Sequence, residues 1–202
     1  MAIQVLRDLR GLRVQVIHPA DGEGVSLVEH LRRIGCTVEA LWPIPEELSD
    51  SVDVVLLSID HDSRDKILKL FRGQNDRMPT LIAVVGYENP STLQIVLESG
   101  ALAVIERPIR PFGLLTNLTI ARSLWMERQE AQRRLRKLER KLSGLQKIQK
   151  AKSILMEKQG LSEEDAYQTL RRQAMGKRVP MEEMALAVIN ANELLHSRLK
   201  GD

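Results

Sequence analysis

Residues 10–120 alternate short apolar runs with stretches of helical periodicity, and this alternation restricts the fold more than any other feature of the chain. The run Val52–Ile59 is almost continuously apolar, as expected for a central strand covered on both faces of a parallel sheet. Four shorter apolar runs predict the remaining strands: Leu12–Ile17, Cys36–Trp42, Thr80–Val85 and Ala103–Ile105. Helical spacing between them predicts three helices: Val25–Ile34, Asp65–Phe71 and Pro90–Glu98. Strands that alternate with helices predict an α/β fold with a doubly wound, five-stranded parallel sheet.

A long helix follows, because the chain contains no proline from Phe112 to Met156. Its apolar residues keep a heptad-like spacing that is interrupted by a polar stretch: Leu114, Leu118, Ala121 and Trp125, then Leu135, Leu138, Leu142 and Leu145. A single helix in water does not satisfy such a stripe, which must pack on the sheet domain, on the tail or on a second chain. We expect a homodimeric coiled coil through six of these residues: Leu118, Trp125, Leu135, Leu138, Leu142 and Leu145.

The tail is predicted to be all-α, with three short helices in a compact bundle. The first is the end of the long helix, with Ile148, Ala151, Ile154 and Leu155 on one face. Ser162 is a helix N-cap followed by carboxylates, and Pro180 suits the first turn of a third helix. The polar residues left outside this bundle are the candidate ligand contacts: Lys147, Lys150, Lys152, Tyr167, Arg171, Arg172, Gln173, Lys177 and Arg178.

Charge is distributed unevenly along the chain. Residues 1–121 hold 12 Lys and Arg against 16 Asp and Glu, whereas residues 122–202 hold 18 against 11. Within residues 122–152 the count is 11 basic against 3 acidic. A basic field confined to one half indicates a polyanionic partner, nucleic acid first, although solvated helix faces also carry such runs.

Several classes of protein are disfavoured. No window of about 18 apolar residues occurs, and the first ten residues lack the apolar core of a signal peptide, so we expect a cytoplasmic protein without a membrane span. The single Cys36 excludes an internal disulfide, and no metal cluster or nucleophile–base pair has workable spacing. The sequence therefore predicts no enzyme, no metal and no cofactor.

The order of elements over residues 10–120 resembles a response-regulator receiver domain, which has a flavodoxin-like fold. A receiver needs an acidic pair, a phosphoacceptor Asp, a hydroxyl and a Lys followed by Pro, and the resemblance implies a cis peptide bond before that Pro. These positions fall here on His18 and Pro19, on Ser58, on Val84 or Val85, and on Arg107 before Pro108. Histidine, proline and serine do not replace hard oxygen ligands and a nucleophilic carboxylate. The domain is thus expected to be a pseudo-receiver with a degenerate phosphorylation site at Ser58, His18, Pro19 and Arg107.

The tail has a distinctive sequence pattern: Ile148-x-x-Ala151-Lys152-x-x-Leu155-Met156, Gly160-Leu161-Ser162, Ala166-Tyr167-x-x-Leu170-Arg171 and Ala174-Met175. This pattern resembles the ANTAR module of transcription antiterminators of the AmiR/NasT type. The resemblance implies three parts: a pseudo-receiver (1–120), a dimerising coiled coil (121–147) and an RNA-binding bundle (148–202). It also implies binding to paired leader-mRNA hairpins, and release by a ligand-sensing negative regulator that docks on the pseudo-receiver and coiled coil. A DNA-binding transcription factor of response-regulator type and an adaptor that binds only protein are the alternatives.

Overall fold

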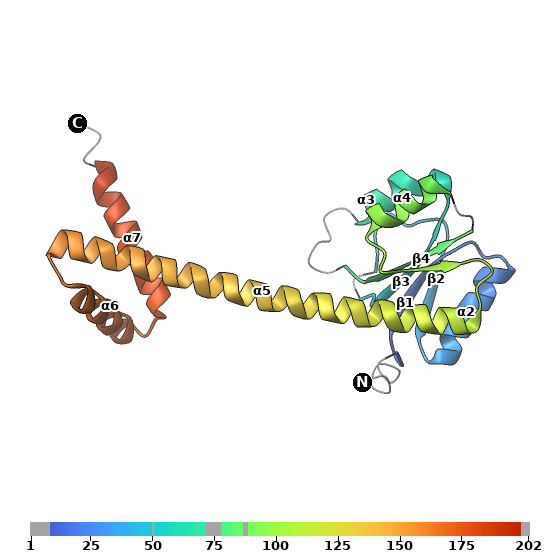
Figure 1. Ribbon diagram of the computed structural model, residues 1–202, viewed down its shortest axis with the longest axis horizontal. Coiled ribbons are helices and arrows are strands. Elements are labelled where there is room, and N and C mark those ends of the chain that lie inside the picture. The colour runs from blue at the N-terminus through green and yellow to red at the C-terminus, as the bar shows by residue number, and fades with distance from the viewer. Residues whose placement is uncertain (1–8, 50, 72–77, 87–88, 199–202) are drawn as a thin grey trace. The chain divides into compact units, whose positions relative to one another are not determined.

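The computed structural model describes residues 9–49, 51–71, 78–86 and 89–198, and the chain divides into two compact units (Figure 1). The first unit covers residues 1–129 and the second covers residues 130–202. One long helix contributes its N-terminal part to the first unit and its C-terminal part to the second. Among the described helices, none is both long enough and apolar enough to cross a bilayer.

The first unit is built on a five-stranded sheet in which every neighbouring pair is parallel, with strand order β2-β1-β3-β4-β5. The strands are β1 (Arg13–Ile17), β2 (Thr37–Leu41), β3 (Val54–Ile59), β4 (Thr80–Val85) and β5 (Ala103–Glu106). All six residues of β3 are buried, as its continuous apolar run requires for a central strand. The predicted doubly wound parallel sheet is therefore confirmed.

Helices cover both faces of this sheet (Figure 1). They are α2 (Gly22–Ile34), the short η1 (His61–Ser63), α3 (Arg64–Phe71), α4 (Pro90–Ser99) and the start of α5 (Pro111–Gln159). Side chains of α2 and α5 form one core with one face of the sheet, and those of α3 and α4 form a second core with the other. Asp21 and Asn89 cap α2 and α4 at their N-termini, and Gly35 and Gly100 end these helices in the left-handed conformation.

The first part of α5 packs in the core of the first unit. Leu114, Leu118 and Ala121 are fully buried there. The indole Nε1 of Trp125 donates to the carbonyl of Met78 at 2.7 Å, and the guanidinium of Arg122 lies 4.3 Å from the indole centroid. The dimer-seam prediction is thereby corrected for Leu118, whose side chain has no surface left for a second chain. Trp125 is likewise engaged within the unit.

The second unit is the predicted three-helix bundle. It contains the C-terminal part of α5, then α6 (Glu163–Lys177) and α7 (Met181–Arg198). Its core joins side chains of all three helices: Ala151, Leu170, Ala174, Met184, Ala185 and Ile189. Three of these six are alanines, so the helix axes approach closely and the bundle stays small. Ser162 caps α6 as expected, because its Oγ accepts from the backbone N–H of Asp165 at 3.1 Å.

Cys36 is buried at the start of β2, with its Sγ 3.5 Å from the carbonyl of Leu9. Burial raises the pKa of its thiol to about 11. The thiolate is the reactive form of cysteine, so this residue behaves as a small core hydrophobe.

Two cis peptide bonds occur in the described residues. The Arg107–Pro108 bond is one of them, as the receiver resemblance implied, and Trp42–Pro43 is the other.

Candidate nucleic-acid interface

The C-terminal half of α6 presents four cations to solvent. The helix turns Ala166, Leu170 and Ala174 into the bundle core, so the residues between and after Leu170 and Ala174 lie on its exposed side. We call the resulting exposed set the α6 basic surface: Arg171, Arg172, Lys177 and Arg178. Gln173 lies beside them and is also exposed. These residues were all predicted as ligand contacts, and the structure places them on one short segment.

Arg178 closes α6 in a left-handed conformation with φ 56°. Its backbone N–H bonds to the carbonyls of Ala174 and Met175, which satisfies two of the last carbonyls of the helix. Arginine at this place complements the negative end of the helix dipole. The backbone thereby fixes where its guanidinium leaves the helix, next to Lys177.

Within the part of the chain that the structure describes, none of the four cations of the α6 basic surface forms an ion pair. Other cations of the same unit are paired. Lys150 Nζ lies 3.0 Å from Glu193 Oε1, and Arg134 pairs with Glu130 one turn earlier on α5. The charge of the α6 basic surface is therefore open to an external anion.

Lys152 behaves differently from the prediction that it is an exposed contact. Its side chain is only 12 % exposed, and its Nζ lies 2.6 Å from Glu163 Oε1. The hydrogen bond and the charge of Lys152 hold the pKa of the Glu163 carboxyl below its ordinary value. Together with Glu164 and Tyr167 this pair lines a surface hollow of about 420 Å³. Sequence reasoning missed Glu163, because the pairing joins the end of α5 to the first turn of α6 across 11 positions.

The remaining predicted contacts are spread out. Lys147 is half-buried on α5, and Lys150 is held by Glu193 of α7. The structure therefore gathers five of the nine predicted contact residues on the C-terminal half of α6, and it puts Lys152 and Tyr167 in the hollow.

Four leucines of α5 lie exposed in the second unit. Leu135, Leu138, Leu142 and Leu145 repeat with 3-4-3 spacing, and each is between 57 % and 65 % exposed. This spacing puts them in one row along the helix. The four leucines form an exposed apolar row on the second unit.

The strand ends of the first unit hold the predicted degenerate phosphorylation site. Arg107 Nη2 donates to Ser58 Oγ at 2.5 Å and lies 2.8 Å from His18 Nε2. His18 Nδ1 lies 2.9 Å from the carbonyl of Pro19, which fits the tautomer that carries its proton on Nδ1 and accepts from Arg107. The structure therefore brings together all four predicted residues: His18 and Pro19 after β1, Ser58 in β3 and Arg107 after β5.

Glu23 of α2 completes this cluster. Its Oε2 lies 3.6 Å from Arg107 Nε, and its Oε1 accepts from the backbone N–H of Ile109 at 2.8 Å. Arg107 thus joins the ends of β1, β3 and β5 to α2. The cluster offers neither a carboxylate nucleophile nor a set of hard oxygen ligands where receivers have them.

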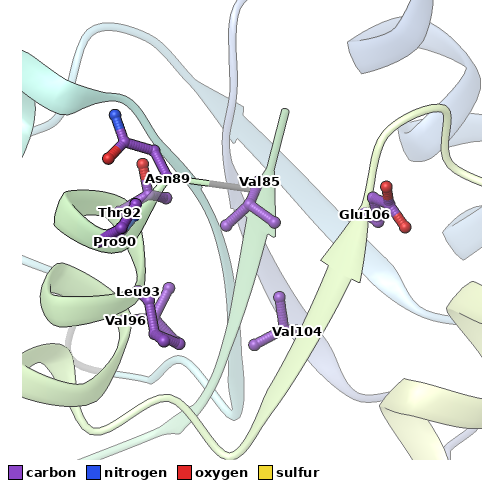
Figure 2. Close-up of a pocket in the computed structure, with 8 residues that line it drawn as sticks. All are labelled: Val85, Asn89, Pro90, Thr92, Leu93, Val96, Val104 and Glu106. Atoms are coloured by element: carbon purple, nitrogen blue, oxygen red, sulfur yellow. The ribbon is translucent and has the colours of Figure 1, made fainter. Parts of the chain in front are cut away.

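A groove of about 570 Å³ lies between α4 and β5 (Figure 2). It is on the face of the sheet opposite to α2. Figure 2 shows Leu93 and Val96 of α4 facing Val104 of β5, with Asn89 and Glu106 at the rim. Leu93 is 59 % exposed and Leu97, one turn further, is 73 % exposed. Sequence reasoning missed this groove, because the apolar residues of α4 have the spacing of an ordinary surface helix.

Two family models match the chain. The model described as "AmiR, N-terminal" matches residues 12–122, and the ANTAR domain model matches residues 136–189. The second range contains the exposed leucine row except Leu135, the hollow and the α6 basic surface.

Curated relatives agree with these matches, and one solved structure shares the fold. The aliphatic amidase regulator of Pseudomonas aeruginosa is 35 % identical over 185 residues, which cover 91 % of this chain and 94 % of that protein. The transcriptional regulatory protein PdtaR of Mycobacterium tuberculosis is 23 % identical over 137 residues, covering 68 % of this chain and 67 % of that protein. The response regulator StyR shares the fold with a TM-score of 0.58 at 15 % identity, covering 90 % of this chain and 99 % of that one.

Proposed function

Because the chain belongs to the AmiR-type family of ANTAR-domain regulators, we propose that it is a positive regulator that binds paired stem-loops in leader mRNA and prevents transcription termination. Bound protein stabilises a leader hairpin that competes with the overlapping terminator hairpin. The polymerase then continues into the operon. This work is done in the cytoplasm and requires no catalysis by the protein.

The observation that carries this proposal is the α6 basic surface, whose four exposed cations lack acidic partners in the described structure. Cations that neutralise RNA phosphates displace condensed counterions, and this supplies affinity that falls with salt. Sequence specificity comes from unpaired loop bases, since side chains do not reach into the deep major groove of an A-form stem. A compact bundle with a short basic segment suits a hairpin loop.

Insertion into a DNA groove is the competing function, and the charges at the helix starts argue against it. A recognition helix presents its N-terminal residues to the bases and to the phosphates beside them. Here α6 begins with exposed Glu163, Glu164 and Asp165, and the first turn of α7 holds Glu182 and Glu183. Phosphates would repel both of these helix starts.

The exposed leucine row supports a homodimer. Two chains that pair through Leu135, Leu138, Leu142 and Leu145 would bring two bundles to two stem-loops, which raises the effective concentration of the second binding event. Basic residues flank this row and would repel their copies: Arg133, Arg134, Arg136, Lys137, Arg140 and Lys141. Bound RNA offsets that repulsion, so RNA binding and dimer formation are expected to strengthen each other.

We also propose that a ligand-sensing partner protein gates the regulator in place of phosphorylation. The strand-end cluster supports this, because Arg107 already donates to Ser58, the residue at the position of a receiver's phosphoacceptor. The groove between α4 and β5 supports a protein partner, since Leu93 and Val104 line it and are exposed, and Leu97 is exposed one turn further along α4. A partner that binds only the form without RNA shifts the population away from the active state.

The test of RNA binding compares a two-hairpin leader RNA with duplex DNA of equal length, both titrated with purified protein at several salt concentrations. We expect the RNA to bind at least ~100-fold more tightly near physiological salt, and affinity for both to fall as salt rises. Equal affinity for RNA and DNA would remove the antitermination proposal and favour the DNA-binding alternative.

Gating is tested separately with Leu93→Ser and Leu97→Ser in one variant. The double variant is expected to bind the leader RNA as well as the unmodified protein does. In cells, a reporter behind that leader should then be expressed without inducer. Inducer dependence that is unchanged in the variant would exclude this groove as the partner's docking surface.

A further inference from the structure

A pocket of about 490 Å³ in the first unit is lined by α2 and by the chain at the ends of β1 and β2, the strand at the edge of the sheet. Protein pockets that bind small molecules have volumes of roughly 300–1,000 Å³. Val25 and Val28 contribute apolar lining from α2, and Ala40 and Trp42 contribute it from the end of β2. Val25 and Trp42 are 54 % and 46 % exposed, so the core of this unit leaves apolar surface uncovered here.

The part of the pocket at the turn between β1 and α2 has a fixed shape. Gly24 lies so close to this turn that a Cβ atom there would clash with the carbonyl oxygen of Pro19 and with Nδ1 of His18. The buried His18 ring is held in turn by the Pro19 carbonyl and by the guanidinium of Arg107. Because these contacts form without a ligand, the pocket is preformed and binding requires little ordering of the protein.

Glu29 and Arg32 line the same pocket with opposite charges. They lie three positions apart on α2, so both project from one side of the helix. Both are exposed, and within the described ranges of the chain neither forms an ion pair. Glu29 would repel a ligand that carries only a carboxylate, and Arg32 would repel one that carries only an ammonium group. These charges therefore suit a ligand that carries both groups.

We propose that this pocket binds a free α-amino acid with a large apolar side chain, such as leucine or phenylalanine. The carboxylate pairs with Arg32, the ammonium group pairs with Glu29, and the side chain packs against Trp42 and Val28. Burial of the apolar side chain supplies affinity, and the two charges select the zwitterion. Amino acids with small or charged side chains lack the apolar contribution.

This inference goes beyond the proposed function, because it gives the first unit a small-molecule ligand of its own and does not depend on RNA binding. His18 and Pro19 belong both to the pocket and to the strand-end cluster. A bound amino acid would therefore stabilise the first unit at the ends of its strands.

The test follows thermal unfolding of the full-length protein by tryptophan fluorescence, with each common L-amino acid except tryptophan and tyrosine, which fluoresce themselves. Both tryptophans lie in the unit that holds the pocket. At about 10 mM, roughly tenfold above the Kd expected for so small a ligand, leucine or phenylalanine should raise the Tm by about 4 °C or more. Glycine, aspartate and lysine should raise the Tm by less than about 1 °C. The proposal is overturned if no amino acid raises the Tm, or if the charged ones raise it as much as leucine does.

Two analogues of phenylalanine separate its charges in isothermal titration calorimetry. The compound 3-phenylpropionate lacks the ammonium group, and 2-phenylethylamine lacks the carboxylate. Each should bind about fivefold more weakly than phenylalanine or worse, because it loses one ion pair and keeps one repulsion. An analogue that binds as tightly as phenylalanine would show that the missing charge is not recognised, and the zwitterion proposal would be wrong.

Three variants place the ligand in the pocket. Arg32→Gln should weaken phenylalanine binding about fivefold, whereas Arg33→Gln makes the same change at the next residue, which is exposed outside the pocket, and should leave binding unchanged. Ala40→Leu fills the pocket from an exposed position of β2 and should abolish binding, with the Tm of the free protein within about 3 °C of the unmodified value.

Equal affinity in Arg32→Gln and Arg33→Gln, or full binding by a folded Ala40→Leu protein, would mean that the amino acid binds elsewhere. Affinity for the leader RNA is measured beside these titrations and should be the same in Ala40→Leu as in the unmodified protein. Failure of the amino-acid pocket thus leaves the RNA-binding proposal intact, and failure of RNA binding leaves the pocket intact.

Discussion

In the first unit Arg107 is enclosed by its own partners, whereas in the second unit Arg171 and Arg172 extend into solvent. The leucines of α5 differ in the same way. Leu114 and Leu118 are fully buried in the first unit, and Leu138 and Leu142 are 62 % and 58 % exposed in the second. Leucines of one helix at similar spacing are therefore core residues in one unit and exposed residues in the other.

This difference shows where binding function can reside. Arg107 donates to Ser58, lies within hydrogen-bond distance of His18 and forms an ion pair with Glu23, so it contributes to the stability of the fold. A cation without an acidic neighbour stays hydrated in the free protein. It can form a new ion pair with a bound anion, and it thereby contributes to the affinity for that anion. In the first unit Arg107 is held by internal partners, whereas in the second unit the α6 basic surface stays exposed.

Leu118→Ala is expected to have the largest effect on stability. Removal of a fully buried leucine should lower the free energy of unfolding of the first unit by about 2–5 kcal/mol. Leu142→Ala should leave that unit unchanged and weaken the dimer, by roughly tenfold in its dissociation constant. Denaturant unfolding followed by tryptophan fluorescence reports the first unit, because Trp42 and Trp125 both lie in it.

Sedimentation equilibrium measures the dimer dissociation constant of the Leu142→Ala protein. A Leu142→Ala chain that dimerises as tightly as the unmodified protein would show that the exposed row is not the dimer contact. A Leu118→Ala chain with unchanged stability would contradict the burial of Leu118 in the core.

Arg171→Ala combined with Lys177→Ala removes two cations of the α6 basic surface. We expect RNA affinity to fall by roughly tenfold or more, and the slope of log affinity against log salt to become shallower by about 1 to 2. Arg32→Ala with Arg33→Ala removes the same charge from exposed positions on α2 and should have little effect. Equal losses in the two double variants would mean that net charge alone attracts the RNA.

Arg107→Met tests whether the strand-end cluster is structural. The substitution leaves the buried Ser58 hydroxyl and His18 ring without their partner, so the first unit should lose about 1–3 kcal/mol. Arg110→Met, at an exposed position three residues later, should stay within about 0.5 kcal/mol. RNA affinity should be unchanged in both variants. A stable Arg107→Met protein would show that the cluster contributes nothing to the fold.

The sequence predicted the positions of helices and strands better than it predicted which side chains contact one another. The continuous apolar run gave β3 to within two residues, and Ser162 gave the start of α6, because both signals are local. The two halves of α5 have similar apolar spacing. The local sequence pattern therefore does not distinguish Leu118, which packs on the sheet, from Leu142, which stays exposed. The Lys152–Glu163 pair and the groove beside Leu93 depend on how separate helices meet, and residue spacing does not record that.

The smallest expected effect is an acid-dependent loss of stability at Asp53, the residue just before β3. Burial by itself would raise the pKa of this carboxyl, but bonds from the backbone N–H of Arg13 (3.0 Å) and from its Nε (3.2 Å), with the charges of Arg13 and Arg122, lower it overall. A carboxyl with a lowered folded pKa stabilises the protein above its unfolded pKa, near 4, and this contribution disappears as pH falls through the folded value. Asp53→Asn should therefore cost up to about 1 kcal/mol at pH 7, and the gap to the unmodified protein should close as pH falls below about 4. Tryptophan-detected unfolding between pH 7 and pH 3 measures this gap, and a gap that stays constant across the range would mean that Arg13 does not hold Asp53 in its charged form.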